Sequence, residues 1–83
     1  MDVTLFGTDG CHLCEQALAL VRAAQGELNL VIQEIDIANS DELLDRYGIR
    51  IPVLQHDGRE LNWPFDQTDL TRFLTVSTEN ERK

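Results

Sequence analysis

The sequence is short of positive charge: seven Lys and Arg residues stand against fifteen Asp and Glu residues, which gives a net charge of -8. The acidic residues are spread along the chain rather than gathered into a tail. A surface of this sign repels phosphate backbones and anionic lipids. We therefore expect neither a nucleic-acid partner nor a membrane partner.

Long apolar runs are also absent, since no stretch approaches the roughly 18 apolar residues of a membrane span. The N-terminus has no basic region followed by an apolar segment and a cleavage site, so we expect a cytoplasmic protein. Cysteine is scarce too, with two residues among 83. Disulfides in the cytoplasm are usually transient and catalytic, which makes these two cysteines the first candidates for function.

A chain of 83 residues allows one domain. Its composition, 42% hydrophobic and 27% charged, is that of a globular domain rather than a disordered chain. We expect a single domain over residues 1–76 and a frayed, polar tail over residues 77–83. The function must therefore reside in that one domain.

The first half of the chain predicts a strand-helix-strand unit. Residues 3–6 are rich in β-branched and aromatic side chains, and residues 7–10, which include two glycines, end that strand. Residues 30–37 are rich in Val and Ile and predict a second, parallel strand. Between the strands we expect a helix capped by Gly26, with apolar residues at helical spacing: Leu13, Ala17, Leu20, Val21 and Ala24.

A short second helix is predicted after Asn39 and Ser40, with Gly48 closing it. The dipeptide Asp57-Gly58 favours a tight type I′ turn. It would join two antiparallel strands, over residues 53–56 and 59–61.

Asp66 predicts the start of a last helix, which carries Leu70, Phe73 and Leu74. The preceding Trp63-Pro64-Phe65 is predicted to plug the core where that helix meets the sheet. The resulting order, β-α-β-α-β-β-α, predicts an α/β fold in which a four-stranded mixed sheet is flanked by three helices.

The two cysteines are separated by two residues and fall at the start of the first helix. The unpaired N–H groups and the dipole at a helix N-terminus favour a thiolate. Cys11 would attack a substrate disulfide, and Cys14 would then resolve the mixed disulfide. His12 could tune Cys11 by placing a cation beside the thiolate, whereas Asp9 would act in the opposite direction. The pattern predicts a thiol-disulfide oxidoreductase.

The strand, the CxxC at a helix start, the Pro-led hairpin and the last helix together resemble the glutaredoxin and thioredoxin superfamily. In particular the chain resembles its short bacterial glutaredoxin-like proteins. Residues 47–54, YGIRIPVL, resemble the stretch that leads into the cis-proline of thioredoxins, shortened by one residue before Ile51. The resemblance implies that Pro52 is cis and faces the CxxC. It also implies that Ile51 offers its backbone to an extended substrate.

The chain departs from glutaredoxins at the positions where they hold glutathione. Thr8 stands where they usually carry a basic residue, and residues 63–69 lack their Gly-Gly and acidic pair. Arg50 replaces the threonine of their Thr-Val-Pro and could hold a substrate carboxylate. We expect a monomer without a bound cofactor that reduces protein or small-molecule disulfides and is re-reduced by a dithiol, with glutathione use poor.

Two other functions are compatible with the residues. Cys11 and Cys14 could be metal ligands, with His12 or His56 as a third, or could share a cluster between two chains, although a closed zinc site needs four ligands. Alternatively, the domain could be a non-catalytic adaptor whose cysteines are vestigial.

Overall fold

The computed structural model describes the backbone of residues 1–81 and the side chains of residues 1–75. The tail expected over residues 77–83 therefore lies outside the residues described in full. The elements, in chain order, are β1 (Asp2–Gly7), α1 (His12–Leu28), β2 (Val31–Asp36), a 3-10 turn (Ile37–Asn39), α2 (Asp41–Tyr47), β3 (Val53–His56), β4 (Arg59–Asn62) and α3 (Gln67–Glu81).

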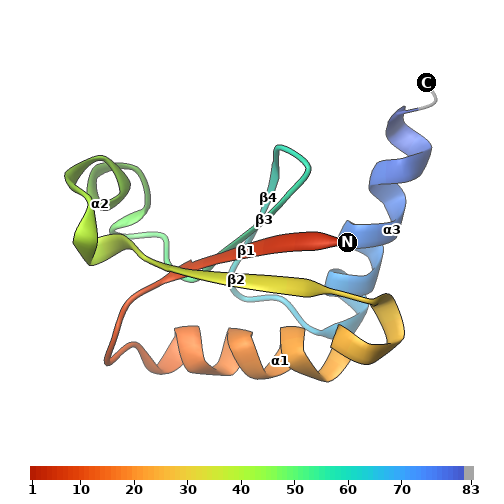
Figure 1. The fold of residues 1–83 in the computed structure, drawn as a ribbon, viewed down its shortest axis with the longest axis horizontal. Helices are drawn as coiled ribbons and strands as arrows, with labels where there is room; N and C mark the ends of the chain where they lie inside the picture. The colour runs from red at the N-terminus through yellow and green to blue at the C-terminus, as the bar shows by residue number, and fades with distance from the viewer. Residues whose placement is uncertain (82–83) are drawn as a thin grey trace.

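The four strands form one mixed sheet with the order β2-β1-β3-β4. Strand β1 pairs parallel with β2 and antiparallel with β3, and β3 pairs antiparallel with β4. Helix α1 runs along one side of the sheet, and α2 lies on the other side near one end (Figure 1). The predicted α/β fold, with its mixed sheet and three helices, is confirmed.

Both faces of β1 pack against helices, since alternate side chains of a strand point to opposite faces. Leu5 of β1 packs with α1 and α3 in the larger core cluster. Its neighbour Phe6 packs with Tyr47 of α2 and Val53 of β3 in a second cluster. The two clusters hold α1 and α2 against opposite faces of β1, and the chain between β1 and α1 crosses the end of the sheet.

Helix α1 does not end at Gly26, as the sequence suggested, but continues to Leu28 and is capped by Asn29. Asn29 adopts the left-handed conformation, with φ at 53°, and its N–H donates to the Gln25 carbonyl. Asn is the non-glycine residue that tolerates this conformation best, so the glycine was not needed. Gly26 lies inside the helix with open space around its Cα.

The second predicted strand also ends earlier than expected. Strand β2 covers Val31–Asp36, and Ile37 begins the 3-10 turn instead of extending the strand. The Asp36 carboxylate accepts a hydrogen bond from the Ala38 N–H at 2.9 Å and so starts this turn. Ile37 is nevertheless buried, in the cluster on the α2 side of the sheet.

The other predicted caps and turns are present. The Ser40 hydroxyl accepts from the Leu43 N–H at the start of α2, and Gly48 closes that helix. Asp57 and Gly58 both have positive φ, 55° and 80°, as a type I′ turn requires. Before α3, the Asp66 carboxylate accepts from the N–H of Asp69 at 2.8 Å, and the Asp69 carboxylate accepts from the Asp66 N–H in return.

Trp63 and Phe65 form the predicted plug. Phe65 is 5% exposed, and Trp63 packs partly buried against the same core cluster. Their rings meet edge to face with centroids 5.1 Å apart. The Trp63–Pro64 peptide bond is also cis, which was not predicted.

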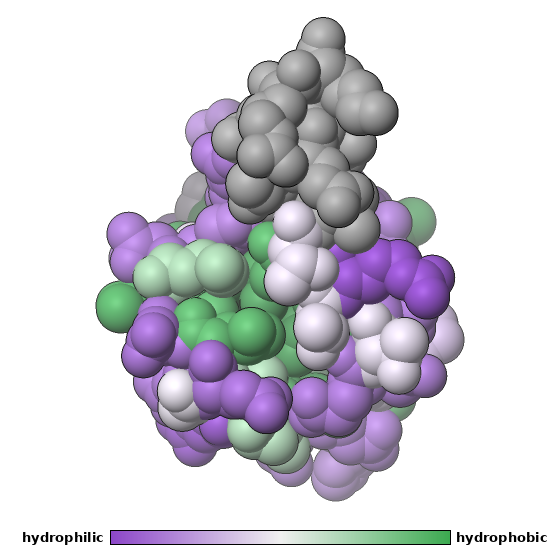
Figure 2. All heavy atoms as spheres, turned by 90° about the vertical axis from the view of Figure 1, so that its right-hand side faces the viewer, coloured by the Kyte–Doolittle hydropathy of each residue, from purple (hydrophilic) through white to green (hydrophobic). Residues whose placement is uncertain are grey.

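At the end of the molecule where β1 begins, hydrophilic residues surround an apolar patch left of the centre of the view (Figure 2). Within residues 1–81, no helix combines the length and the hydropathy needed to cross a membrane.

Candidate functional site

The candidate site lies where the chain leaves β1 and enters α1. Strand β1 ends at Gly7, and Gly10 turns the chain with φ at 79°, a conformation that side-chain-bearing residues rarely adopt. Cys11 is then extended, with φ -94° and ψ 106°, and is the N-cap of α1. The CxxC therefore occupies the first turn of the helix, as predicted.

The two sulfurs are close enough to form a disulfide, and the structure has them bonded, with the Cα atoms 5.2 Å apart. Cys11 Sγ also accepts a hydrogen bond from the Cys14 backbone N–H at 3.1 Å. It thus occupies the position in which Ser or Asp usually caps a helix. Cys11 is partly exposed, whereas Cys14 is 8% exposed. The environments of the two sulfurs are clearly different.

Cys14 is packed against the end of β1. A Cβ on Gly7 would lie only 3.0 Å from Cys14 Sγ and 3.1 Å from Cys14 Cβ. Glycine is thus what allows the second cysteine to approach the strand so closely. From the sequence, Gly7 was predicted only to end the strand. Its contact with Cys14 depends on how α1 packs on the sheet, which no local pattern specifies.

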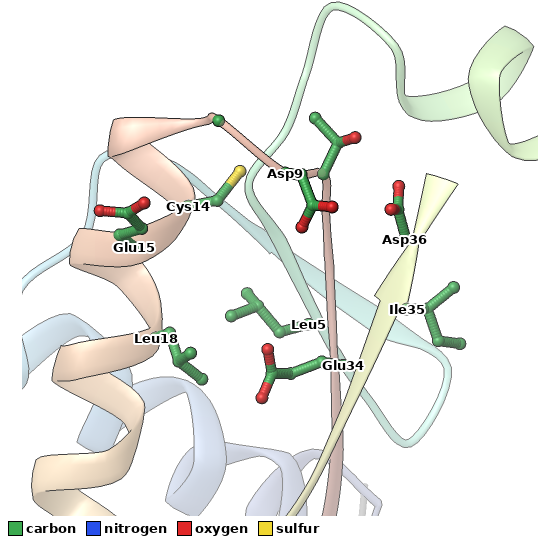
Figure 3. Close-up of a pocket in the computed structure, with 11 residues that line it drawn as sticks. Leu5, Asp9, Cys14, Glu15, Leu18, Glu34, Ile35 and Asp36 are labelled. Atoms are coloured by element: carbon green, nitrogen blue, oxygen red, sulfur yellow. The ribbon is translucent and has the colours of Figure 1, made fainter. Parts of the chain in front are cut away.

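A cavity of about 250 Å³ opens beside Cys14, between α1, the β1–α1 loop and the end of β2 (Figure 3). Its lining includes four carboxylates, Asp9, Glu15, Glu34 and Asp36, and no Lys or Arg. Glu34 pairs with Arg22 at 3.3 Å, in an ion pair whose side chains are both more than half exposed. The wall of the cavity therefore presents negative charge beside the buried sulfur. The proximity of these four acidic residues was not predicted, because they come from three separate segments of the chain.

The two histidines are placed differently relative to the CxxC. His12 is exposed in the first turn of α1, next to Cys11. His56 Nδ1 lies 2.9 Å from the Asp2 carbonyl, at the start of β1. Since β1 is six residues long, that contact lies about 17 Å along the strand from Gly7. His56 is therefore too far away to complete a metal site with the cysteines.

Among residues 1–75, whose side chains the structure describes, no group of three or more His, Cys, Asp and Glu side chains is arranged to hold a metal ion. The alternative of a metal-binding module thus gains no support from the described residues.

The predicted substrate-binding segment precedes β3. The Ile51–Pro52 peptide bond is cis, and Pro52 is buried. The N–H groups of Arg50 and Ile51 both donate to the Tyr47 carbonyl, at 2.8 and 3.1 Å. The Ile51 N–H is therefore already used within the chain.

Arg50 is also engaged. Its Nη2 donates to the Glu60 carboxylate at 2.6 Å and to the Asn62 side-chain oxygen at 3.1 Å. The same carboxylate accepts a hydrogen bond from the Tyr47 hydroxyl at 2.7 Å. We call Tyr47, Arg50, Glu60 and Asn62 the Glu60 network. The Glu60 network was not predicted from the sequence, because Glu60 is one of fifteen acidic residues spread along the chain.

The Glu60 network perturbs the titration of two of its members. Hydrogen bonds from Arg50 and then Tyr47 lower the pKa of Glu60 below 4.5. Burial, followed by the hydrogen bond to Glu60, raises the pKa of Tyr47 above 10.0, although the nearby Arg46 acts in the opposite direction. Tyr47 is 1% exposed and its ring stacks on Phe6, with centroids 4.3 Å apart.

Comparison with known proteins places this arrangement in a family. The model of the glutaredoxin-like domain (DUF836) matches residues 2–75. The X-ray structure of the structural-genomics target protein XcR50 from X. campestris is 37% identical, covers 89% of this chain and 96% of its own, and superposes with a TM-score of 0.80. Protein Ne2328 from Nitrosomonas europaea is 28% identical, with coverage of 87% and 88% and a TM-score of 0.73.

Thioredoxin 1 from Thermosipho africanus shares the fold at 15% identity, with a TM-score of 0.70 and full coverage of both chains. No curated protein matches the sequence. The family match spans nearly the whole chain, including the CxxC and the segment that precedes β3. The chain therefore belongs to the glutaredoxin-like (DUF836) family of the thioredoxin superfamily.

Proposed function

We propose that this protein is a thiol-disulfide oxidoreductase in which Cys11 is the nucleophile and Cys14 the resolving residue. The proposal depends on one observation above all: Cys11 Sγ is the N-cap acceptor of α1, 3.1 Å from the Cys14 N–H. A negative charge on that sulfur would gain a charge-assisted hydrogen bond and the favourable end of the helix dipole. The partly exposed Cys11 is also the sulfur that a substrate can reach.

The reaction proceeds in two exchanges. The Cys11 thiolate attacks one sulfur of the substrate disulfide, which forms a mixed disulfide and releases the other substrate sulfur as a thiolate that takes up a proton. Cys14 then gives up its proton and attacks Cys11 Sγ. This step forms the Cys11–Cys14 disulfide and releases the second substrate thiol. A dithiol donor returns both cysteines to the reduced form by the same exchanges in reverse.

Cys14 is suited to the second role because it is a poor first nucleophile, whose attack becomes favourable once a mixed disulfide lies beside it. Its sulfur is buried, and four carboxylates line the cavity beside it. Both burial and neighbouring negative charge favour the neutral thiol over the thiolate. The mixed disulfide then brings an electrophilic sulfur within one helical turn of Cys14, which makes its attack intramolecular.

The charges around the site favour a dithiol donor over glutathione. Glutathione is an anion at neutral pH, and a site that binds it should offer cationic donors for its carboxylates. Thr8 offers none, the cavity wall is acidic, and the guanidinium of Arg50 is already bound to Glu60. Protein or small-molecule disulfides that do not depend on a carboxylate contact are therefore the proposed substrates.

The test of the proposal is a pair of single-cysteine variants that are incubated with a disulfide substrate and analysed by intact mass. Cys14→Ser should accumulate a mixed disulfide at Cys11, because the first exchange can occur and the second cannot. Cys11→Ser should accumulate far less, since the buried Cys14 sulfur is a poor first nucleophile. Equal trapping by the two variants would show that the roles are wrongly assigned. No reversible oxidation of the wild-type pair would favour the adaptor function instead.

A further inference from the structure

The Glu60 network lies on the face of the sheet that carries α2, next to the segment that leads into Pro52. Glu60 and Asn62 are two residues apart on β4, so their side chains point to the same face. Tyr47 ends α2, and Arg50 follows it in the loop before β3. Three separate stretches of the chain thus contribute to one cluster of polar groups.

Both oxygens of the Glu60 carboxylate and both hydrogens of Arg50 Nη2 have partners within the Glu60 network. One Glu60 oxygen accepts from Arg50 at 2.6 Å, and the other accepts from Tyr47 at 2.7 Å. Both hydrogens of Arg50 Nη2 have acceptors, since Asn62 takes the second at 3.1 Å. The guanidinium also lies over the Tyr47 ring, 5.3 Å from its centroid. The Arg50 and Glu60 side chains are 37% and 29% exposed, so a solute could reach them but the pair is not fully solvated.

We infer that Glu60 is a specificity-determining residue: its carboxylate occupies the guanidinium of Arg50 and so closes that cation to the carboxylate of a substrate. This inference rests on the proposed function, because it assumes that substrates bind along the segment before Pro52. Arg50 lies two residues before that proline. A substrate carboxylate that approached Arg50 Nη2 would have to displace an internal carboxylate that is tethered, partly desolvated and held by a second donor. At the rest of the guanidinium it would meet a cation whose charge Glu60 already neutralises.

Removing the charge of Glu60 should therefore make the guanidinium of Arg50 available to a substrate carboxylate. Gln at position 60 keeps the length of the side chain and an oxygen that can accept from Tyr47, but it no longer neutralises the guanidinium. An incoming carboxylate would then gain a cation without competition from Glu60. A partly exposed ion pair is worth up to about 1 kcal/mol, which corresponds to roughly a fivefold change in affinity.

The experiment measures equilibrium binding of S-methylglutathione, which carries two carboxylates and has no free thiol or disulfide to exchange. We expect Glu60→Gln to bind this probe about fivefold more tightly than the wild type. The double variant Glu60→Gln/Arg50→Gln should lose that gain. The diethyl ester of the probe, which has no carboxylates, should show no gain with Glu60→Gln.

A matched control separates this effect from a change in net charge. Glu27→Gln alters the charge of the whole protein equally, at an exposed residue of α1, on the opposite side of the sheet from the Glu60 network. It should leave the affinity for S-methylglutathione unchanged. If Glu60→Gln bound the probe no more tightly than Glu27→Gln, the inference would be overturned.

The single variant Arg50→Gln tests the same point in a chain that retains Glu60. Because Arg50 is closed in the wild type, this variant should bind the probe as the wild type does. A marked loss of affinity would show that Arg50 already holds the substrate carboxylate, and would sink the inference even if Glu60→Gln failed to fold. Binding is measured without turnover, so a wild type inactive in disulfide exchange would overturn the proposed function and not this result.

Discussion

Replacing Gly7 by Ala tests whether the approach of Cys14 to β1 is needed for the second exchange. The added methyl group would lie 3.0 Å from Cys14 Sγ, whereas ordinary contacts of a Cβ begin at 3.4 Å. Cys14 would therefore have to move by a few tenths of an ångström. The neighbouring Cys14 Cβ, at 3.1 Å, restricts the directions in which it can do so.

The expected loss of stability follows from two opposing effects. Overpacking a buried site by one methyl group costs about 1–3 kcal/mol. Replacing a strand glycine by alanine recovers about 0.5–1 kcal/mol of backbone entropy. The net loss should be about 0–2.5 kcal/mol. For a domain of this size, each kcal/mol lowers the Tm by roughly 4–8 °C.

Gly26→Ala is the control for this substitution. Gly26 lies inside α1 with nothing within 4 Å of the added Cβ, so only the backbone effect remains. This variant should gain about 0.5–1 kcal/mol of stability. The two glycine variants are thus expected to move the Tm in opposite directions.

The functional assay for Gly7→Ala follows a mixed disulfide between Cys11 and a chromogenic aromatic thiol. Release of the thiol reports the attack by Cys14. Because that attack depends on the position of Cys14 Sγ, displacing it should slow the release on the order of tenfold. The formation of the mixed disulfide at Cys11 should change much less. Wild-type Tm together with wild-type release would refute the role given to Gly7.

Four further predictions concern ionisation and the choice of reductant. The pKa of the reduced Cys11 thiol should lie below the ordinary value of about 8.5, because of its N-cap position, and a thiolate absorbance titration centred at or above that value would contradict this. Catalytic efficiency should be lower with glutathione than with a dithiol donor at equal pH and salt. Efficient turnover of glutathione that is lost in Arg50→Ala would contradict this prediction. Tyr47 is the single tyrosine, so its absorbance titration should lie above 10.0 and shift down in Glu60→Gln. The ionised Glu60 stabilises the fold at neutral pH, and this contribution should be lost as the pH falls below 4.5, a loss that Glu60→Gln should not show in acid unfolding.

Local signals in the sequence predicted the fold well because they act over a few residues. The Asp57-Gly58 turn, the Ser40 cap and the start of the last helix at Asp66 each depend on hydrogen bonds or φ values within three or four positions. The predicted end of α1 was wrong because both Gly and Asn can adopt the left-handed conformation of a C-cap. The sequence has Gly26 and Asn29 in this region, and Asn29 is the cap. Propensity alone does not choose between them.

The candidate site was predictable only where it is contiguous. Cys11 and Cys14 were identified because one helical turn fixes their relation. The contact between Gly7 and Cys14 depends on how closely α1 packs against β1, which no local pattern specifies. The pairing of Arg50 with Glu60 likewise depends on the register of the β3–β4 hairpin.

The electrostatics of the site explain why membership of a glutaredoxin-like family need not bring a glutathione site with it. Thiol exchange needs only the sulfur pair and the helix start, and both are local to residues 11–14. Glutathione binding needs cations at a distance from the sulfurs, and those positions change independently of the exchange chemistry. In this chain Thr8 carries no charge and Arg50 is paired with Glu60. If the proposed exchange takes place, the charge around the site would select a partner other than glutathione without altering the redox step. Exchange with a dithiol and binding of a glutathione analogue therefore test two separate properties.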